Sequence, residues 1–501
     1  MKNTISSCGK LTVLIGILIL FPILSIPFFP KDIIYIQDFL IPGAASAGLG
    51  FLMCVYGRKS RGQASRQDDR NWKSQLISGS TTVLYVWCFA CAAGALPFVL
   101  SGQLRFVQAL FEVVSGWTTT GLSVVDVTQT PQVFLFYRSF MQFCGGLGFV
   151  MVMILFTQGR QSMNLFTSEG HPDKVMPNLK ETARAIFIVY LSWLVIGTAA
   201  YVICGMPVFD SILHTMGALS TGGFSNRTDS IGAYNSISIE AVTILLMIIG
   251  TTNFAVLLLA VKGQWKMVFK NGEIRLLGLL LLVFVPLTGA SIAFTMYTGF
   301  GEGVRIALFN IVSALSTTGY SLGSYNTWPA FGIGVMVMMM LIGGGIGSTA
   351  GGIKLSRVLI MLKHGLYSIY AKITPEHKIS IPHYWNAQGK TAITGDIVSS
   401  VSAFITCYLV IYLAGTLLLT VTAGASLTDA MFEFASSLGT VGLSIGLTNP
   451  ATSDPTLIVE IVGMLLGRLE IYIVLSGLYS LFFLSFRNRK TKGRSAGRTA
   501  A

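Results

Sequence analysis

One short pattern occurs four times in this chain, and it constrains the fold more than any other feature of the sequence. In each copy a Thr lies two residues before a Gly, and a Ser lies two residues after that Gly. Nine residues before the Gly stands a polar side chain. The copies contain Thr119, Gly121 and Ser123; Thr221, Gly223 and Ser225; Thr317, Gly319 and Ser321; and Thr440, Gly442 and Ser444, and the polar residues are Glu112, His214, Asn310 and Glu433. Such an internal repeat predicts one structural unit used four times.

The composition places these units in a membrane. Hydrophobic residues make up 52% of the 501 residues and charged residues only 11%, against about 25% charged residues in a typical soluble domain. Apolar runs of about 20 residues, long enough to cross a bilayer as helices, recur along the chain. The predicted spans are 11–29, 34–56, 76–100, 132–157, 184–205, 237–261, 275–299, 329–342, 394–422 and 456–485. The expected fold is therefore an all-α membrane protein with ten transmembrane helices.

Four shorter apolar stretches lie between these spans, and each ends at a copy of the Thr-x-Gly pattern. They cover residues 104–117, 207–219, 302–315 and 427–438. Because they are too short to cross the bilayer, we interpret them as re-entrant helices, which are tolerated where protein buries them or water reaches them. Each repeat then consists of a helix, a re-entrant pore helix, a filter-like loop and a second helix.

Two helices precede the first repeat, so the chain divides into a leading hairpin and four pseudo-fourfold repeats. The predicted boundaries are 1–70 for the hairpin and 71–160, 161–265, 266–372 and 373–501 for the repeats, the last with a basic cytoplasmic tail. The polar stretch 363–393 is expected to be a cytoplasmic loop with a short surface helix. No soluble enzyme domain is expected.

The basic residues orient the chain. Lys and Arg gather in segments that share one face if the spans alternate, whereas the segments after each Thr-x-Gly carry almost none. The positive-inside rule therefore places both termini in the cytoplasm and all four turns on the outer side. The same rule accounts for the formal net charge of +13, so nucleic acid is not expected as a partner, while contact with anionic membrane lipid is a further reading of this charge. The first apolar run is interpreted as an uncleaved span, because prolines stand where a signal peptide has small residues.

A ring of four such turns suits the passage of a cation. Carbonyl oxygens can replace the water shell of potassium without a full negative charge that would hold the ion too tightly. Gly allows backbone conformations that a Cβ would obstruct, and each short helix directs its negative C-terminal end toward the membrane centre. The aligned Thr and Ser side chains are expected to bond across neighbouring turns. The polar residue nine positions before each Gly is expected near the start of its short helix in a structural role, with direct ion contact as the less favoured alternative.

On these motifs, and over nearly its whole length, the chain resembles the Trk/Ktr/HKT superfamily of potassium transport proteins. The leading hairpin is similar to that of TrkH-type members. The resemblance implies a selectivity filter made of Thr119, Thr120, Gly121, Thr221, Gly222, Gly223, Thr317, Thr318, Gly319, Thr440, Val441 and Gly442. It also implies a preference for potassium, because sodium-preferring HKT members carry Ser where this chain has Gly121. Gly222 and Val441 depart from the usual middle Thr, which matters little if that position acts through its main chain.

A glycine-rich segment interrupts the second helix of the third repeat. Its glycines are Gly343, Gly344, Gly345, Gly347, Gly351 and Gly352. Each Gly costs a helix about 1 kcal/mol relative to Ala, so this segment should not be a stable helix. Close helix packing through small residues is one interpretation. We favour a flexible intramembrane loop beneath the filter that hinders ion flow, because the resemblance implies such a gate.

Arg468 stands within the last predicted span, about 12 residues or roughly 18 Å from its outer end. An Arg near the bilayer centre costs at least about 2.5–3.5 kcal/mol unless it faces water or a partner. Glu470 is two residues away and therefore on another face of the helix, but Glu460 or a loop carbonyl remains a possible partner. The resemblance implies that Arg468 faces the pore below the filter, repels cations and holds the glycine-rich loop. Lys354 is interpreted as a cytoplasmic-side residue that obeys the positive-inside rule.

Other classes of membrane protein fit the sequence less well. A secondary transporter of another solute would show inverted repeats and acidic residues at the midplane. A membrane enzyme would need a cluster of acidic, His or Cys residues near one face, whereas the five His are scattered. We therefore expect a gated, channel-like pore for potassium and rubidium rather than an enzyme. Proton- or sodium-coupled potassium symport remains the alternative.

The resemblance also implies partners and a location. TrkH-type subunits form homodimers in the bacterial inner membrane and work with a cytoplasmic TrkA-type subunit that binds nucleotide. The chain has no G-x-G-x-x-G dinucleotide unit of its own, and no cofactor is expected beyond potassium as the transported ion. The basic loops 158–184, 262–275 and 354–393 are the expected docking surfaces for the regulatory subunit.

Overall fold

Nearly every regular element of this chain is a helix. The computed structural model describes residues 2–59, 72–148, 179–296, 299–374, 381–469, 471 and 474–475. Within these residues the strands are β1 (His383–Asn386) and β2 (Gly389–Ala392), which form one antiparallel hairpin. The predicted all-α fold class is thereby confirmed, with this hairpin as a small addition in the polar stretch 363–393. That stretch also contains the end of α16 (Leu355–Ile373), a longer helix than expected.

A helical hairpin leads the described part of the chain. It consists of α1 (Lys2–Leu20), the short 3-10 helices η1 (Phe21–Phe28) and η2 (Pro30–Tyr35), and α2 (Ile36–Lys59). The two long helices approach closely through glycines, since a Cβ at Gly16 would lie 2.6 Å from the carbonyl oxygen of Gly43. The Asp32 carboxylate at the bend accepts a 2.9 Å hydrogen bond from the backbone N–H of Val133 and so ties the hairpin to the first repeat.

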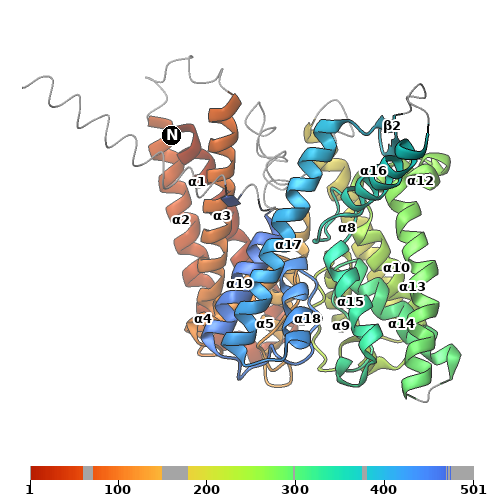
Figure 1. Ribbon diagram of the computed structural model, residues 1–501. Coiled ribbons are helices and arrows are strands. Elements are labelled where there is room, and N and C mark those ends of the chain that lie inside the picture. The colour runs from red at the N-terminus through yellow and green to blue at the C-terminus, as the bar shows by residue number, and fades with distance from the viewer. Residues whose placement is uncertain are drawn as a thin grey trace, which may run out of the picture.

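The described residues after this hairpin contain the same series of three helices four times. The first helices are α3 (Trp72–Leu100), α8 (Leu179–Ile203), α13 (Gly272–Met296) and α17 (Gly395–Ala423). The short helices are α4 (Phe106–Trp117), α9 (Val208–Leu219), α14 (Phe300–Leu315) and α18 (Leu427–Gly439). The second helices are α5 (Gln132–Leu147), α10 (Ile237–Thr251), α15 (Ala330–Ile342) and α19 (Asp454–Arg468). Figure 1 shows all four short helices at the end of the molecule opposite the N-terminus.

One predicted span, 237–261, is broken. Here α10 and α11 (Phe254–Val261) meet at 111°. The Asn253 side chain caps α11 by accepting a hydrogen bond from the N–H of Ala255. The glycine-rich segment lies against the break, where the N–H of Gly345 donates a 3.0 Å hydrogen bond to the Thr251 carbonyl. The predicted span therefore consists of two helices, because a segment from another repeat satisfies the backbone groups that the break exposes.

Six helices in the described part of the chain are long and apolar enough to cross a membrane, or seven if the bent pair counts as one span. The second helices of repeats 1, 3 and 4 contain 16, 13 and 15 described residues. The predicted spans 132–157 and 456–485 extend beyond the described residues. A total of ten transmembrane helices therefore stays a prediction.

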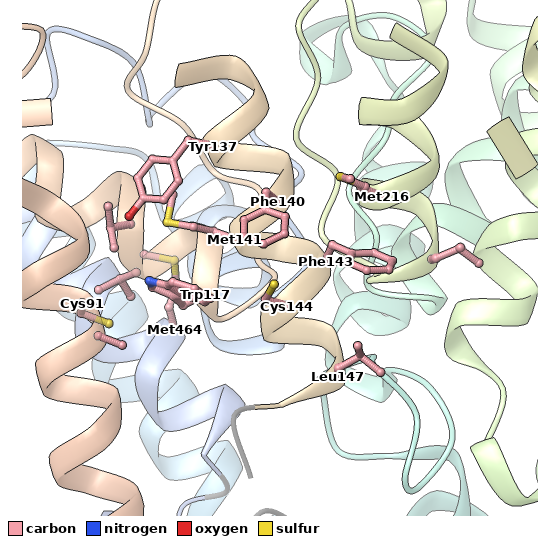
Figure 2. Close-up of a cluster of buried hydrophobic side chains, with 14 of the residues drawn as sticks. Cys91, Trp117, Tyr137, Phe140, Met141, Phe143, Cys144, Leu147, Met216 and Met464 are labelled. Atoms are coloured by element: carbon pink, nitrogen blue, oxygen red, sulfur yellow. The ribbon is translucent and has the colours of Figure 1, made fainter. Parts of the chain in front are cut away.

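The short helix α4 is packed on three sides. Figure 2 shows Trp117 at its end between Cys91 of α3, Met464 of α19 and the face of α5 that carries Met141 and Cys144. The Trp117 side chain is fully buried. Such dense packing of large side chains fixes the end of the short helix, from which the first turn begins.

Candidate functional site

The four Thr-x-Gly turns share one unusual backbone conformation. The φ angles of Thr119, Thr221, Thr317 and Thr440 lie between 50° and 56°, and Gly121, Gly223, Gly319 and Gly442 also have positive φ. A β-branched residue in the left-handed region is a genuine outlier, and such strain persists where the surrounding structure enforces it, often at functional sites. Because it recurs at all four matching positions, this conformation is a property of the repeated unit.

Each turn is closed by the same backbone bond. The N–H of the middle residue donates to the carbonyl of the residue five positions earlier, at 2.8 or 2.9 Å. The four bonds run from Thr120 to Ser115, from Gly222 to Gly217, from Thr318 to Ser313 and from Val441 to Ser436. They join each turn directly to the C-terminal end of its short helix.

The four turns form a closed ring. A Cβ placed on the glycine of one turn would overlap the carbonyl oxygen of the middle residue in the next turn. The overlapping pairs are Gly121 with Gly222, Gly223 with Thr318, Gly319 with Val441, and Gly442 with Thr120. The last pair returns to the first repeat, so the ring closes, and only glycine permits these approaches.

One cavity of about 440 Å³ lies against this ring, and all four turns contribute to its wall. Gly121, Gly223, Gly319 and Gly442 line it, together with Ser123, Ser225, Ser321 and Ser444. The turns therefore surround a common axis and face one shared aqueous mouth.

The polar residues nine positions before the glycines hold the segments that leave the turns. Glu112 accepts from the Ser123 hydroxyl at 3.0 Å, and the bond between His214 Nε2 and the Ser225 hydroxyl is also 3.0 Å long. Glu433 accepts from Ser444 in the same way, whereas Asn310 accepts from the N–H of Leu322. All four polar side chains are fully buried.

Two expectations about these residues are wrong. Three of the four serines bond within their own repeat rather than across to a neighbouring turn, because the chain leaving the turn runs back along its own short helix. The polar residue also lies beyond the first turn of its helix, since α4 begins at Phe106 and Glu112 is its seventh residue.

The glycine-rich segment lies directly against the ring. It joins α15 to α16 without helical structure. Gly351 N–H donates to the Thr317 hydroxyl at 2.8 Å, and the Thr221 hydroxyl bonds that of Thr349 at 3.1 Å. A Cβ on Gly351 would overlap the Thr440 hydroxyl oxygen. Threonines of three turns therefore contact this segment, on the side of the ring away from that cavity.

Arg468 bridges the glycine-rich segment and α5. Its guanidinium donates to the Thr349 carbonyl at 2.5 Å and to the Gly145 carbonyl at 2.7 Å. The sequence analysis considered a loop carbonyl and Glu460 as partners, and the structure has the loop carbonyl. Glu460 instead contacts the Thr448 hydroxyl, and Glu470 lies outside the described residues. Arg468 is the fifteenth residue after its helix N-cap, and the matching positions of the other second helices hold Gly146, Thr251 and Gly344.

Lys354 belongs to the same region, a contact that the sequence did not indicate, and its place on the cytoplasmic side stays a prediction. Its ammonium group donates to the Ala350 carbonyl within the glycine-rich segment. Lys354, Arg357 and Arg468 line one small cavity of about 50 Å³. The backbone of Lys354 has a φ of 80°, which the sequence does not reveal.

Comparison with known proteins decides the family. The model of a family described as TrkH, cation transport protein, matches residues 59–271 and 274–476. The chain belongs to the TrkH family. It is 30% identical over 451 residues to the Trk system potassium uptake protein TrkH of Halomonas elongata, covering 87% of this chain and 90% of that one. It is 31% identical over 419 residues to the Trk system potassium uptake protein TrkG of Escherichia coli, covering 81% and 85%. The crystal structure of the potassium transporter TrkH from Vibrio parahaemolyticus superposes with a TM-score of 0.80 at 25% identity, covering 95% of this chain and 97% of that one.

Membership in the TrkH family agrees with two expectations from the sequence. The chain is a multi-pass membrane protein of a cation transport family, and it is not an enzyme.

Two residues that support the ring in this TrkH-family chain were not identified from the sequence. Arg138 of α5 donates to Glu112 at 2.5 Å and stacks over the Phe224 ring at 4.1 Å. Gln142, one turn further, donates to the Gly222 carbonyl at 2.5 Å and accepts from Phe224 N–H at 3.0 Å. The signal was available for Arg138, because an Arg inside an apolar span needs a partner, as Arg468 does.

Proposed function

We propose that this TrkH-family chain takes up potassium through a gated, channel-like pore. The proposed filter is the ring of four turns, with potassium and rubidium preferred over sodium. The observation that carries the proposal is the closed ring, in which every filter glycine packs against a carbonyl of the next repeat. The relatives' designation as potassium uptake proteins supports the choice of ion.

The chemistry of the ring fits a partly dehydrated cation. Main-chain carbonyl dipoles coordinate such an ion without binding it too tightly to release. The C-terminal ends of the four short helices meet at the ring and add partial negative charge. Because the glycines allow no side chain at the ring, the backbone itself sets the width of the pore.

The proposed gate is the glycine-rich segment together with Arg468. The segment contacts the ring at Thr221 and Thr317, and the guanidinium of Arg468 holds it at Thr349. A positive charge at this depth repels a cation leaving the ring, and the low dielectric of the surroundings strengthens that repulsion. Opening then requires that the segment move away from the threonines.

We further propose that the protein works as a homodimer in the bacterial inner membrane, with both termini in the cytoplasm. Its regulatory partner would be a cytoplasmic TrkA-type subunit that binds nucleotide. The relatives' designation as parts of a Trk system supports a multi-component assembly. The basic loops 262–275 and 354–393 are candidate docking surfaces, while 158–184 lies almost wholly outside the described residues. Full partner binding after deletion of residues 375–390 would exclude the last of these loops.

The test is cation flux into proteoliposomes, comparing potassium, rubidium, sodium and lithium for the wild type and Gly121→Ser. We expect potassium and rubidium flux well above sodium flux, and a weaker preference in the variant, because the new side chain overlaps the Gly222 carbonyl. Gly334→Ser is the matched control, since nothing lies within 4 Å of a Cβ there. Absence of cation flux under an imposed potential, with the cytoplasmic partner supplied, would contradict the pore. Potassium flux that depends on a proton or sodium gradient would support coupled symport instead.

A further inference from the structure

The fourth repeat holds two buried carboxyl groups that the conduction pathway does not use directly. Glu433 of α18 and Glu460 of α19 are both fully buried. The hydroxyl oxygen of Thr448 lies 2.6 Å from Glu433 Oε1 and 3.0 Å from Glu460 Oε1. In the part of the chain that the structure describes, neither carboxyl group forms an ion pair.

In the first repeat, an arginine neutralises the buried carboxylate. Its Glu112 corresponds to Glu433 and pairs with Arg138. Arg138 is the seventh residue after the N-cap of α5, and Glu460 is the seventh residue after the N-cap of α19. An acid therefore stands in repeat 4 where a base stands in repeat 1. Two carboxylates that share one buried hydroxyl cannot both remain ionised without a counter-charge.

The hydrogen bonds identify which group carries the proton. Glu433 accepts four bonds, from the hydroxyls of Ser444 and Thr448 and from the N–H groups of Ile445 and Thr448. Such a set suits an ionised carboxylate, which only accepts. The single proton of the Thr448 hydroxyl is thus directed to Glu433, so the second contact of that oxygen requires Glu460 to be the donor.

We propose that Glu460 is held as a neutral carboxylic acid that donates to Thr448, and that this proton positions the fourth filter loop. Thr448 fixes Glu433, and Glu433 holds Ser444, two residues beyond the filter glycine Gly442. Loss of the proton would place a second negative charge beside Glu433 and push the loop apart. Ser444 and Thr448 both line the cavity beside the ring, which connects the shared hydrogen-bond network to the solution on that side. This inference rests on the proposed filter.

No other charge in the described surroundings takes the place of the proton. The titratable and charged side chains on the helices that pack against α19, and at its own ends, are Arg105, Glu112, Asp396, Cys407, Tyr408, Tyr412, Asp429, Glu433, Asp454 and Arg468. Arg105 pairs with Asp454 at the rim, Glu112 with Arg138, and Arg468 with carbonyls. Tyr412 donates to the Met431 carbonyl. Only Glu433 shares a hydrogen-bond partner with Glu460.

Infrared difference spectroscopy in H₂O and D₂O tests the proton directly, without reference to transport. The purified wild type at about neutral pH should show a protonated carboxyl C=O band that shifts in D₂O and is absent from Glu460→Gln. Glu302→Gln, which changes an exposed carboxylate on α14, is the control and should keep the band. Absence of the band from the wild type, or its persistence in Glu460→Gln, would overturn the proposal.

Flux into oriented proteoliposomes tests the positioning role. The potassium-over-sodium preference of the wild type should fall by about fivefold as external pH rises from about 6 to about 10, the loss expected for about one hydrogen bond. Glu460→Gln, a neutral mimic, should give a flat profile, and Thr448→Ser should retain the wild-type profile while Thr448→Val loses it. Identical pH profiles for the wild type and Glu460→Gln would overturn the role. Failure of the proposed function would instead appear as no potassium flux from the wild type at about pH 6.

Discussion

Gly351 donates its backbone N–H to the hydroxyl of Thr317 across 2.8 Å, although Thr317 precedes the second helix of the third repeat in sequence and Gly351 follows it. The bond joins a strained threonine of the ring to the glycine-rich segment. Because the ring and the segment touch through side-chain oxygens of the threonines, movement of the segment changes the hydrogen bonds of those hydroxyl groups. The carbonyl ring itself need not move.

Substitution of Gly351 by Ala should weaken this contact. A Cβ there overlaps the Thr440 hydroxyl and the Gly439 carbonyl, so the segment must withdraw from the ring. Loss of one hydrogen bond of about 1 kcal/mol would raise the open population about fivefold. Single-channel or flux recordings without a regulatory partner measure this change. Gly365→Ala on α16, where a Cβ meets nothing within 4 Å, should leave flux unchanged. Lower flux from Gly351→Ala would argue against a closing role for the segment.

Arg468→Gln should increase potassium conduction more than Gly351→Ala does. The change removes a positive charge and two charge-assisted hydrogen bonds, to Thr349 and Gly145, so we expect at least about a tenfold rise. Arg468→Lys keeps the charge but loses the planar fork that reaches two carbonyls, and it should give an intermediate flux. Equal flux from all three proteins would show that Arg468 is structural only.

Arg138→Met should destabilise the protein through Glu112. Both side chains are almost completely buried, and removal of one partner of a buried ion pair typically costs about 3–5 kcal/mol. The double variant Glu112→Gln with Arg138→Met should recover part of that loss, since no charge remains unpaired. The stabilities of the wild type, the single variant and the double variant are compared by heating each in detergent and measuring the folded fraction by size-exclusion chromatography. A double variant less stable than the single one would contradict the explanation.

Asp126 should assist the capture of cations at the outer mouth. Its exposed carboxylate lines the outer cavity, and hydrogen bonds from the hydroxyl and N–H of Thr128 hold its pKa below the usual value. The charge is therefore present at neutral pH and disappears only as external pH falls below that lowered pKa. Asp126→Asn should raise the KM for potassium about twofold at low ionic strength and little at high salt, because salt screens exposed charges. An effect that is independent of salt would point to a structural role.

The repeated parts of the fold were predictable because each depends on local sequence. The short helices lie within a few residues of their predicted ranges, and glycine-rich composition alone predicted the non-helical segment after Ile342. The break at Thr252 and Asn253 was not predictable, since a segment nearly a hundred residues later supplies its backbone partners. The contact of Lys354 with the Ala350 carbonyl was not predictable either, since it accompanies a positive φ that the sequence does not show.

The supporting side chains illustrate the same limit. Gln142 has no local signal, because its role depends on the Gly222 carbonyl of another repeat. Glu460 is one acidic residue in an apolar helix, and only the common hydroxyl of Thr448 distinguishes it from a simple partner for Arg468. Sequence reasoning thus identified the residues of the candidate ring, and the tertiary structure was needed for what holds them.

Arg468 stands once in the molecule, while its three counterparts are Gly146, Thr251 and Gly344. In a tetramer of identical subunits, any substitution at this level would appear four times around the axis. A single polypeptide with four repeats avoids that multiplication. In the proposed pore, a residue such as Arg468 can therefore change in one repeat while the backbone of the other three turns stays the same.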